Sequence, residues 1–78
     1  MDQITLRELY NRYPIVGNIS EGLISVGING EFFHVSQEDG EPVYKERFDW
    51  TEDFHDGLAL VEKNGESFHI NPNGERID

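Results

Sequence analysis

The sequence contains no cysteine among its 78 residues, and this absence excludes several kinds of stabilisation and chemistry. Disulfide bonds, thiolate metal sites and cysteine nucleophiles all require the missing residue. A chain of this length forms one domain at most, and it buries only about 60–65% of its unfolded surface. Packing against further units, or self-association, is therefore the remaining source of added stability.

Basic residues are scarce as well. Six lysines and arginines stand against sixteen aspartates and glutamates, which gives a formal charge of −10. Such a chain cannot neutralise a row of phosphates, nor is it attracted to an anionic membrane surface. The composition therefore predicts no nucleic-acid partner and no membrane partner. Basic protein surfaces stay open as partners, although solvation of the loops is the simpler interpretation of the acids.

Long hydrophobic runs are also absent. Met1 is followed by Asp2 and Gln3, so the basic and apolar segments of a secretory signal are not seen. The longest apolar stretches are a few residues long, far short of a membrane span. The sequence therefore predicts a cytoplasmic protein.

What the sequence does contain begins with a helix signal. Thr5 is a suitable N-cap, and Glu8 follows three residues later, as a capping box requires. Pro14 disfavours helical backbone at Tyr13, so we expect the helix to end near Arg12. A helix of about two turns is not stable alone and must dock on the rest of the chain.

The most informative pattern is an internal duplication at an offset of 35 residues. Residues 12–23 align with residues 47–58, and the register then holds through the next block. The paired positions are Asn29 with Asn64, Gly30 with Gly65, Phe33 with Phe68, His34 with His69 and, after one extra residue, Gly40 with Gly74. We therefore predict an N-terminal helical cap (1–11), a first β-repeat (12–46) and a second β-repeat (47–78) within one structural unit.

Each copy has the pattern of a three-stranded antiparallel meander, so the predicted fold class is all-β with one short helix. The Asn29-Gly30 and Asn64-Gly65 pairs predict type I′ hairpin turns, because both central residues need positive φ. A second turn ends at Gly40 in one copy and at Gly74 in the other. The predicted strands are 23–28, 31–36 and 41–45 in the first copy and 58–63, 66–71 and 75–77 in the second. An acidic and aromatic linker (46–56) joins the copies, and alternation places Phe33 and Val35 on one face with Phe32 and His34 on the other.

The blocks that carry the duplication also carry a family resemblance. Ile19-Ser20-Glu21-Gly22-Leu23 and Phe54-His55-Asp56-Gly57-Leu58, each followed by an Asn-Gly turn and a closing glycine, resemble the WG-type repeat family of bacterial proteins. The repeat signature lies at Gly22, Leu23, Gly57 and Leu58. The Trp-Gly dipeptide of the family is missing from both copies, where Phe32-Phe33 and Ser67-Phe68 stand instead. The resemblance implies a repeat scaffold for protein contacts and no chemistry. Such arrays usually need three or more units, so we expect an N-terminal piece of a longer array.

Three histidines are the candidates for chemistry. His34 and His69 occupy equivalent positions and could lie side by side, where a carboxylate would complete a zinc site. Two histidines leave that ligand set incomplete, so hydrogen-bonded strand residues are the favoured interpretation. His55, between Asp53 and Asp56, could act as a base, but no nucleophile motif accompanies it. We therefore predict no catalytic residue, no metal and no cofactor.

Aromatic residues around the linker suggest a contact surface. Phe48 and Phe54 are expected to fill the gap between the copies, whereas Trp50 is the better candidate for exposure. The residues predicted to touch a partner are Trp50, Tyr13, Phe32, His34 and His69. The leading hypothesis is a non-catalytic module for protein interaction or scaffolding, which binds a protein partner, further repeats of its own chain or a second copy. The alternative is a small acidic inhibitor or immunity-like protein that binds a basic site, and a remote alternative is a hydrolase fragment using His55 or the histidine pair.

Overall fold

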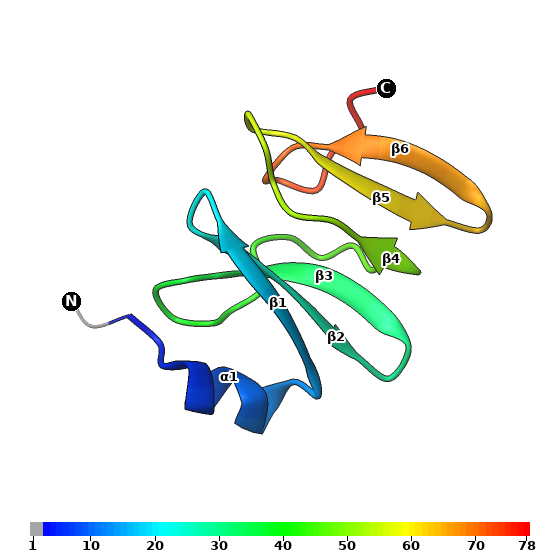
Figure 1. Cartoon of the computed structure of the whole chain (residues 1–78). Helices are drawn as coiled ribbons and strands as arrows, with labels where there is room; N and C mark the ends of the chain where they lie inside the picture. The colour runs from blue at the N-terminus through cyan, green and yellow to red at the C-terminus, as the bar shows by residue number, and fades with distance from the viewer. Residues whose placement is uncertain (1–2) are drawn as a thin grey trace.

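The computed structural model describes residues 3–78, which form two three-stranded antiparallel sheets preceded by one short helix (Figure 1). The all-β fold class with a short N-terminal helix is therefore confirmed. The elements are α1 (Leu6–Arg12), β1 (Ile15–Ser20), β2 (Leu23–Ile28), β3 (Glu31–Ser36), β4 (Trp50–Thr51), β5 (Ala59–Lys63) and β6 (Glu66–Ile70).

Helix α1 begins and ends where its local signals place it. The Glu8 backbone N–H donates to Thr5 Oγ1 at 3.2 Å, and the Thr5 backbone N–H donates to Glu8 Oε1 at 3.3 Å, so the capping box is complete. The backbone bond from Thr5 is the main reason why the pKa of Glu8 lies below its ordinary value. Tyr13, which precedes Pro14, is extended and ends the helix.

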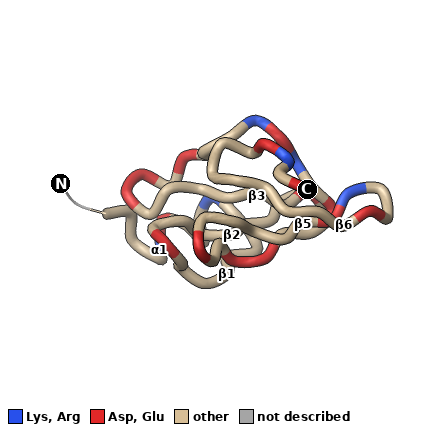
Figure 2. The backbone as a smooth tube through the Cα atoms, turned by 90° about the horizontal axis from the view of Figure 1, so that it is seen from above, with Lys and Arg blue, Asp and Glu red and all other residues tan. Residues whose placement is uncertain are grey.

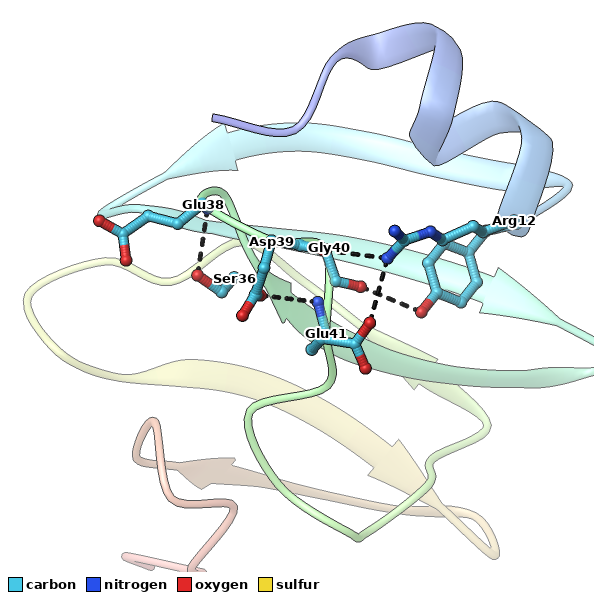
Figure 3. A network of polar contacts seen from close by, with 7 residues as sticks. Arg12, Ser36, Glu38, Asp39, Gly40 and Glu41 are labelled. Carbon is cyan, nitrogen blue, oxygen red and sulfur yellow. Dashed lines mark hydrogen bonds and ion pairs between the residues drawn. The ribbon is translucent and has the colours of Figure 1, made fainter. Parts of the chain in front are cut away.

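The helix docks on the turn that follows β3. The Ile4 backbone N–H donates to the carbonyl of Glu38 at 2.9 Å. At the other end of α1, the Arg12 guanidinium donates to the carbonyl of Asp39 at 2.9 Å and to the Glu41 carboxylate at 3.2 Å (Figure 3). Gly40 has a φ of +71° and lies so close to the Ile4 side chain that a Cβ would clash with it. A glycine is therefore required here both for backbone conformation and for space.

The first sheet has the order β1-β2-β3, and the second has the order β4-β5-β6. The Asn29-Gly30 and Asn64-Gly65 turns have positive φ at both residues, so the predicted type I′ geometry is confirmed. Glu21-Gly22 and Asp56-Gly57 have the same paired positive φ values. The Gly-Leu blocks are thus a second pair of tight turns, a role that the sequence analysis did not assign to them.

The predicted third strand of each meander was wrong. Residues 41–45 and 75–77 contribute only isolated bridges, Val35 with Pro42 and Ile70 with Arg76. The third strand of each sheet comes instead from the preceding residues, as β1 in the first sheet and β4 in the second. Pro42 has no N–H to donate, which limits ladder formation along the first of these segments.

The segment after β3 connects the two sheets through hydrogen bonds to both. Phe48 exchanges two backbone hydrogen bonds with Phe32 of β3, at 2.8 and 2.9 Å. The next residue, Asp49, donates its backbone N–H to the carbonyl of Glu62 in β5 at 2.9 Å. The chain therefore leaves the edge of the first sheet and becomes the edge strand of the second within two residues.

One hydrophobic core runs through both sheets and the connection between them. Phe33 and Val35 lie on the inner face of β3, as alternation predicted, and Ala59, Val61 and Ile70 supply the equivalent face of the second sheet. The buried members are Leu9, Ile24, Val26, Phe33, Val35, Tyr44, Phe48, Phe54, Ala59, Val61 and Ile70. Phe48 and Phe54 are buried between the copies, as expected for residues that fill the gap.

Acidic residues are spread over the turns and connecting segments of the described chain, and the basic positions are few among them (Figure 2). Within residues 3–78, no helix is long and apolar enough to cross a membrane.

Candidate functional site

A groove lies between the first sheet and β4, and its volume is about 460 Å³. Strand β1 forms one wall, and its pairing with β2 shifts between Val16 and Ile19. Such a bulge bends the strand locally and re-aims its side chains. The lining residues are Ile15, Gly17, Asn18, Ser25, Phe32, Trp50, Thr51, Glu52 and Asp53.

Trp50 is the most prominent side chain of the groove, because half of its surface is exposed. Its ring lies against the ring of Phe32, with centroids 5.2 Å apart and planes at 57°. Phe32 in turn lies over Gly27, where an added Cβ would approach the ring to 2.7 Å. Gly27 therefore provides the flat backbone surface on which Phe32, and through it Trp50, is held.

The floor of the groove is polar and its rim is acidic. Ser25 and Thr51 are buried and share a hydrogen bond of 2.5 Å between their hydroxyls. Glu52 and Asp53 follow at the rim, and none of the lining residues carries a positive charge. The groove thus combines an exposed indole with negative charge, which suits an apolar group flanked by a cation.

His34 lies behind this groove and is completely buried. Its Nε2 lies 2.8 Å from the carbonyl of Glu52, an atom that can only accept. Nε2 therefore carries the proton, and Nδ1 accepts from the Tyr44 hydroxyl at 2.6 Å. Burial lowers the pKa of His34 below its ordinary value, so the ring is neutral, and it raises that of Tyr44. Both ring nitrogens of His34 therefore have hydrogen-bond partners. The buried ring joins the two copies and is not a surface residue.

His69, the equivalent residue of the second copy, has a different environment. Its side chain is 43% exposed, and its Nδ1 lies 2.8 Å from the Asp78 carboxylate. The backbone N–H of His69 also donates to Asp78, and this bond is the main reason why the pKa of Asp78 is lowered. Within residues 3–78, no group of three or more histidine or acidic side chains is arranged to hold a metal ion.

The stretch from Ser36 at the end of β3 to Glu66 at the start of β6 matches the family model of the WG containing repeat, over residues 36–66. This match supports the resemblance of the chain to the WG containing repeat family. No curated protein and no solved structure matches the chain. The matched stretch includes the segment that joins the sheets, the groove residues 50–53 and the Asp56-Gly57 turn. The matched stretch begins in the first predicted copy and ends in the second.

The structure brings together only two of the predicted contact residues, Trp50 and Phe32. Tyr13 lies on the opposite face of the first sheet, edge-on to Phe33, and its hydroxyl donates to the Gly40 carbonyl at 3.2 Å. His34 is enclosed and His69 lies on the far sheet. His55, the residue considered as a base, is exposed and 3.6 Å from its neighbour Asp56.

The groove residues that were not predicted from the sequence are Ile15, Gly17, Asn18, Ser25, Thr51, Glu52 and Asp53. Ile15 and Asn18 were missed because β1 was not recognised as a strand. The signal that could have found it is the Glu21-Gly22 pair, which marks a hairpin turn and so requires a strand on each side. The glycines at positions 22, 30, 40, 57, 65 and 74 all have positive φ.

Proposed function

We propose that this WG repeat module is non-catalytic and binds a protein partner through the Trp50 groove. The exposed indole, held by Phe32, carries the proposal, because tryptophan is one of the side chains in which the energetically dominant positions of protein interfaces are enriched. Half of its surface remains in contact with solvent although Phe32 fixes its position. A preorganised anchor of this kind loses little side-chain entropy when a partner binds.

Strand β1 offers the second element of recognition. It is an edge of its sheet, since β2 is its one neighbour in the described strand order. An edge strand presents unpaired backbone groups to an incoming extended segment. Ile15 and Ile19 are both about half exposed along this edge. An extended peptide could therefore pair with β1 while one of its side chains packs against Trp50.

Charge specifies the partner further. Glu52 and Asp53 lie on the groove and the chain carries a formal charge of −10. We expect the partner segment to contain lysine or arginine next to an aliphatic or aromatic residue. Long-range attraction would raise the association rate at low salt.

Intrinsic fluorescence tests this function directly, because Trp50 is the single tryptophan of the chain. The probe is a set of synthetic octapeptides in which one leucine or phenylalanine is flanked by lysines, with glutamates replacing the lysines in the matched set. We expect the basic peptides to shift the Trp50 emission saturably and the acidic ones to leave it unchanged. Phe32→Ala should weaken this binding at least fivefold, whereas Tyr10→Ala, which removes an exposed aromatic residue of α1, should not. Equal responses to the two sets, or no response to either, would refute the proposal.

The acidic inhibitor is the second candidate, and the charge of the chain favours it. An inhibitor that acts mainly by charge should lose most of its affinity between 50 and about 500 mM salt, because surface attraction is screened. Binding anchored by Trp50 should retain most of its affinity over the same range. The salt dependence of the peptide titration therefore separates the two functions.

A further inference from the structure

The contact between the first sheet and the segment that follows it is built from a small set of polar groups. The Ser20 hydroxyl donates to the Phe54 carbonyl at 2.5 Å. Ser25 bonds to Thr51, and His34 bonds to the carbonyl of Glu52. These bonds hold residues 51–54 across the outer face of the first sheet, opposite the face that carries Phe33 and Val35.

Glu21 completes this contact by capping the next tight turn. Its carboxylate accepts the backbone N–H groups of Asp56 at 2.5 Å and of Gly57 at 2.9 Å. The Glu21-Gly22 turn and the Asp56-Gly57 turn are equivalent by the 35-residue offset. The Glu21-Gly22 turn therefore supplies the carboxylate that accepts the backbone N–H groups of the equivalent Asp56-Gly57 turn.

The second sheet carries the same set of positions, but its outer face is not covered within the described residues. Counting 35 residues forward from Ser20, Glu21, Ser25, Phe32 and His34 gives His55, Asp56, Leu60, Ser67 and His69. Four of these, His55, Asp56, Leu60 and His69, line a second hollow of about 390 Å³. The hollow thus occupies, on the second sheet, the place that residues 51–56 fill on the first.

We propose that the outer face of the second sheet is a docking surface for one more unit of the same type, which presents a strand and turn equivalent to residues 47–57. Asp56 would cap the tight turn of the incoming segment, as Glu21 caps the Asp56-Gly57 turn. His69 would donate to a backbone carbonyl, as His34 does to Glu52. The backbone of Ser67, equivalent to that of Phe32, would pair with the aromatic residue at the Phe48 position.

The substitutions between the two faces specify the incoming segment. Leu60 stands where Ser25 bonds to Thr51, so the docked segment should carry an apolar residue at the Thr51 position. Ser67 stands where Phe32 supports Trp50, so no aromatic residue is needed at the Trp50 position. The preferred segment therefore has an aromatic residue at the Phe48 position, an apolar residue three positions later and a tight turn containing glycine.

A second copy of this chain is a poor occupant. Leu9 lies against Gly40 in the first copy, in the place that Tyr44 takes against Gly74 in the second. Helix α1 therefore occupies the position of a preceding connecting segment. If a second copy docked through its residues 12–22, its α1 would have to occupy the same space as residues 75–78 of the first copy. The proposal is thus a surface for a unit that lacks such a helix.

For the test, residues 1–77 are joined directly to an added copy of residues 44–78. Tyr44 of the added copy then takes the place of Asp78, and the spacing between the units continues. Hydrogen exchange is followed by NMR at the Ser67 amide. We expect docking to slow Ser67 exchange at least tenfold relative to the original chain, and to move urea unfolding to a higher midpoint in one transition. The matched control carries Phe48→Asp in the added copy and should leave Ser67 exchange as in the original chain.

A specificity exchange tests the assignment of Leu60. Thr51→Val in the added copy should slow Ser67 exchange further. When Leu60 of the second sheet is changed to Ser (Leu60→Ser), the order should reverse: the added copy that keeps Thr51 should slow Ser67 exchange more than the Thr51→Val copy. Unchanged Ser67 exchange beside a disordered added copy would overturn the proposal. Protection of β1 amides in place of Ser67, or concentration-dependent dimers, would also overturn it. The proposed function is judged separately, because its peptide titration is carried out on the original chain without the added copy.

Discussion

Replacing His34 should be far more damaging than replacing His69, although the two residues are equivalent in the sequence duplication. His34→Ala removes the partners of the Tyr44 hydroxyl and the Glu52 carbonyl, both at hydrogen-bond distance from its ring. It also removes an edge-on contact with Phe54, whose ring centroid lies 4.6 Å away. His69→Ala loses only a half-exposed interaction with Asp78.

The magnitude follows from the number of groups left without a partner. Each buried polar group that loses its hydrogen bond costs about 1–3 kcal/mol, and an aromatic contact contributes about 0.5–1.5 kcal/mol. His34→Ala should therefore lower the free energy of unfolding by roughly 3–7 kcal/mol. A folded domain of this size has only about 4–12 kcal/mol in total, so this variant should lose a large share of its stability. His69→Ala should cost about 1 kcal/mol or less, as exposed pairs do.

Urea unfolding followed by circular dichroism measures this difference at pH 7.5. His34→Gln serves as a milder variant, because its amide can still donate to the Glu52 carbonyl, and it should leave enough structure for a complete curve. Equal losses for the His34 and His69 variants would refute the reasoning, since the argument depends on burial of only one of the two rings.

The same residue predicts a pH dependence. Because burial lowers the pKa of native His34 below 6.5, the unfolded chain binds a proton there that the native chain does not. Stability is therefore full above pH 6.5 and falls as the pH drops below it, by up to about 1.4 kcal/mol per pH unit, until the native pKa is reached. The window from pH 6.5 to about 5 lies above the ordinary pKa of glutamate, so carboxylates contribute little. His34→Gln should flatten this slope, and a wild-type chain without the slope would contradict the assignment.

Two further predictions concern the turns. Glu21→Ala should lower the free energy of unfolding by about 1 kcal/mol, because it frees two backbone N–H groups, whereas Glu38→Ala should change it by less than about 0.5 kcal/mol. Gly57→Ala and Gly74→Ala both force alanine to a φ near +80°, but the Gly74 variant should cost about 1–3 kcal/mol more, because its Cβ would lie 2.8 Å from Tyr44 Cβ. Urea unfolding measures all four variants, and equal losses for the two glycine variants would show that space around Gly74 is not limiting.

Local signals in the sequence were sufficient for the helix and for the Asn-Gly turns. The capping box of Thr5 and Glu8 and the stop before Pro14 depend only on neighbouring residues, and both predicted ends of α1 are confirmed. The Asn29-Gly30 and Asn64-Gly65 turns likewise require only the preference of those residues for positive φ. The resemblance to the WG-type repeat family was also predicted from the sequence, and the match over residues 36–66 supports it. The boundaries of the two repeats at residues 12, 47 and 78 stay predictions.

The membership of the sheets could not be predicted in the same way. Strand β1 is mostly exposed and contains Gly17 and Asn18 at its bulge, so it lacks the alternation that identifies a strand. Residues 41–45 look more like a strand, but they mainly connect the sheets. Burial of His34 was also beyond local analysis, because His69 has a similar local sequence and a half-exposed ring. The difference arises from residues 44–54, which cover only the first of them.

The hydrogen bonds of Phe48 and Asp49 to opposite sheets have a consequence for dissecting the protein. A cut between residues 46 and 47, where the sequence duplication would place it, removes from the first sheet the edge partner of Phe32 and the lid over His34. A cut just before Glu41 removes the same groups and also Glu41 and Val43, which bond to the outer edge of β3. Neither site yields two self-sufficient halves, so the smallest fragment suited to expression is the one that keeps residues 41–52 attached to both sheets.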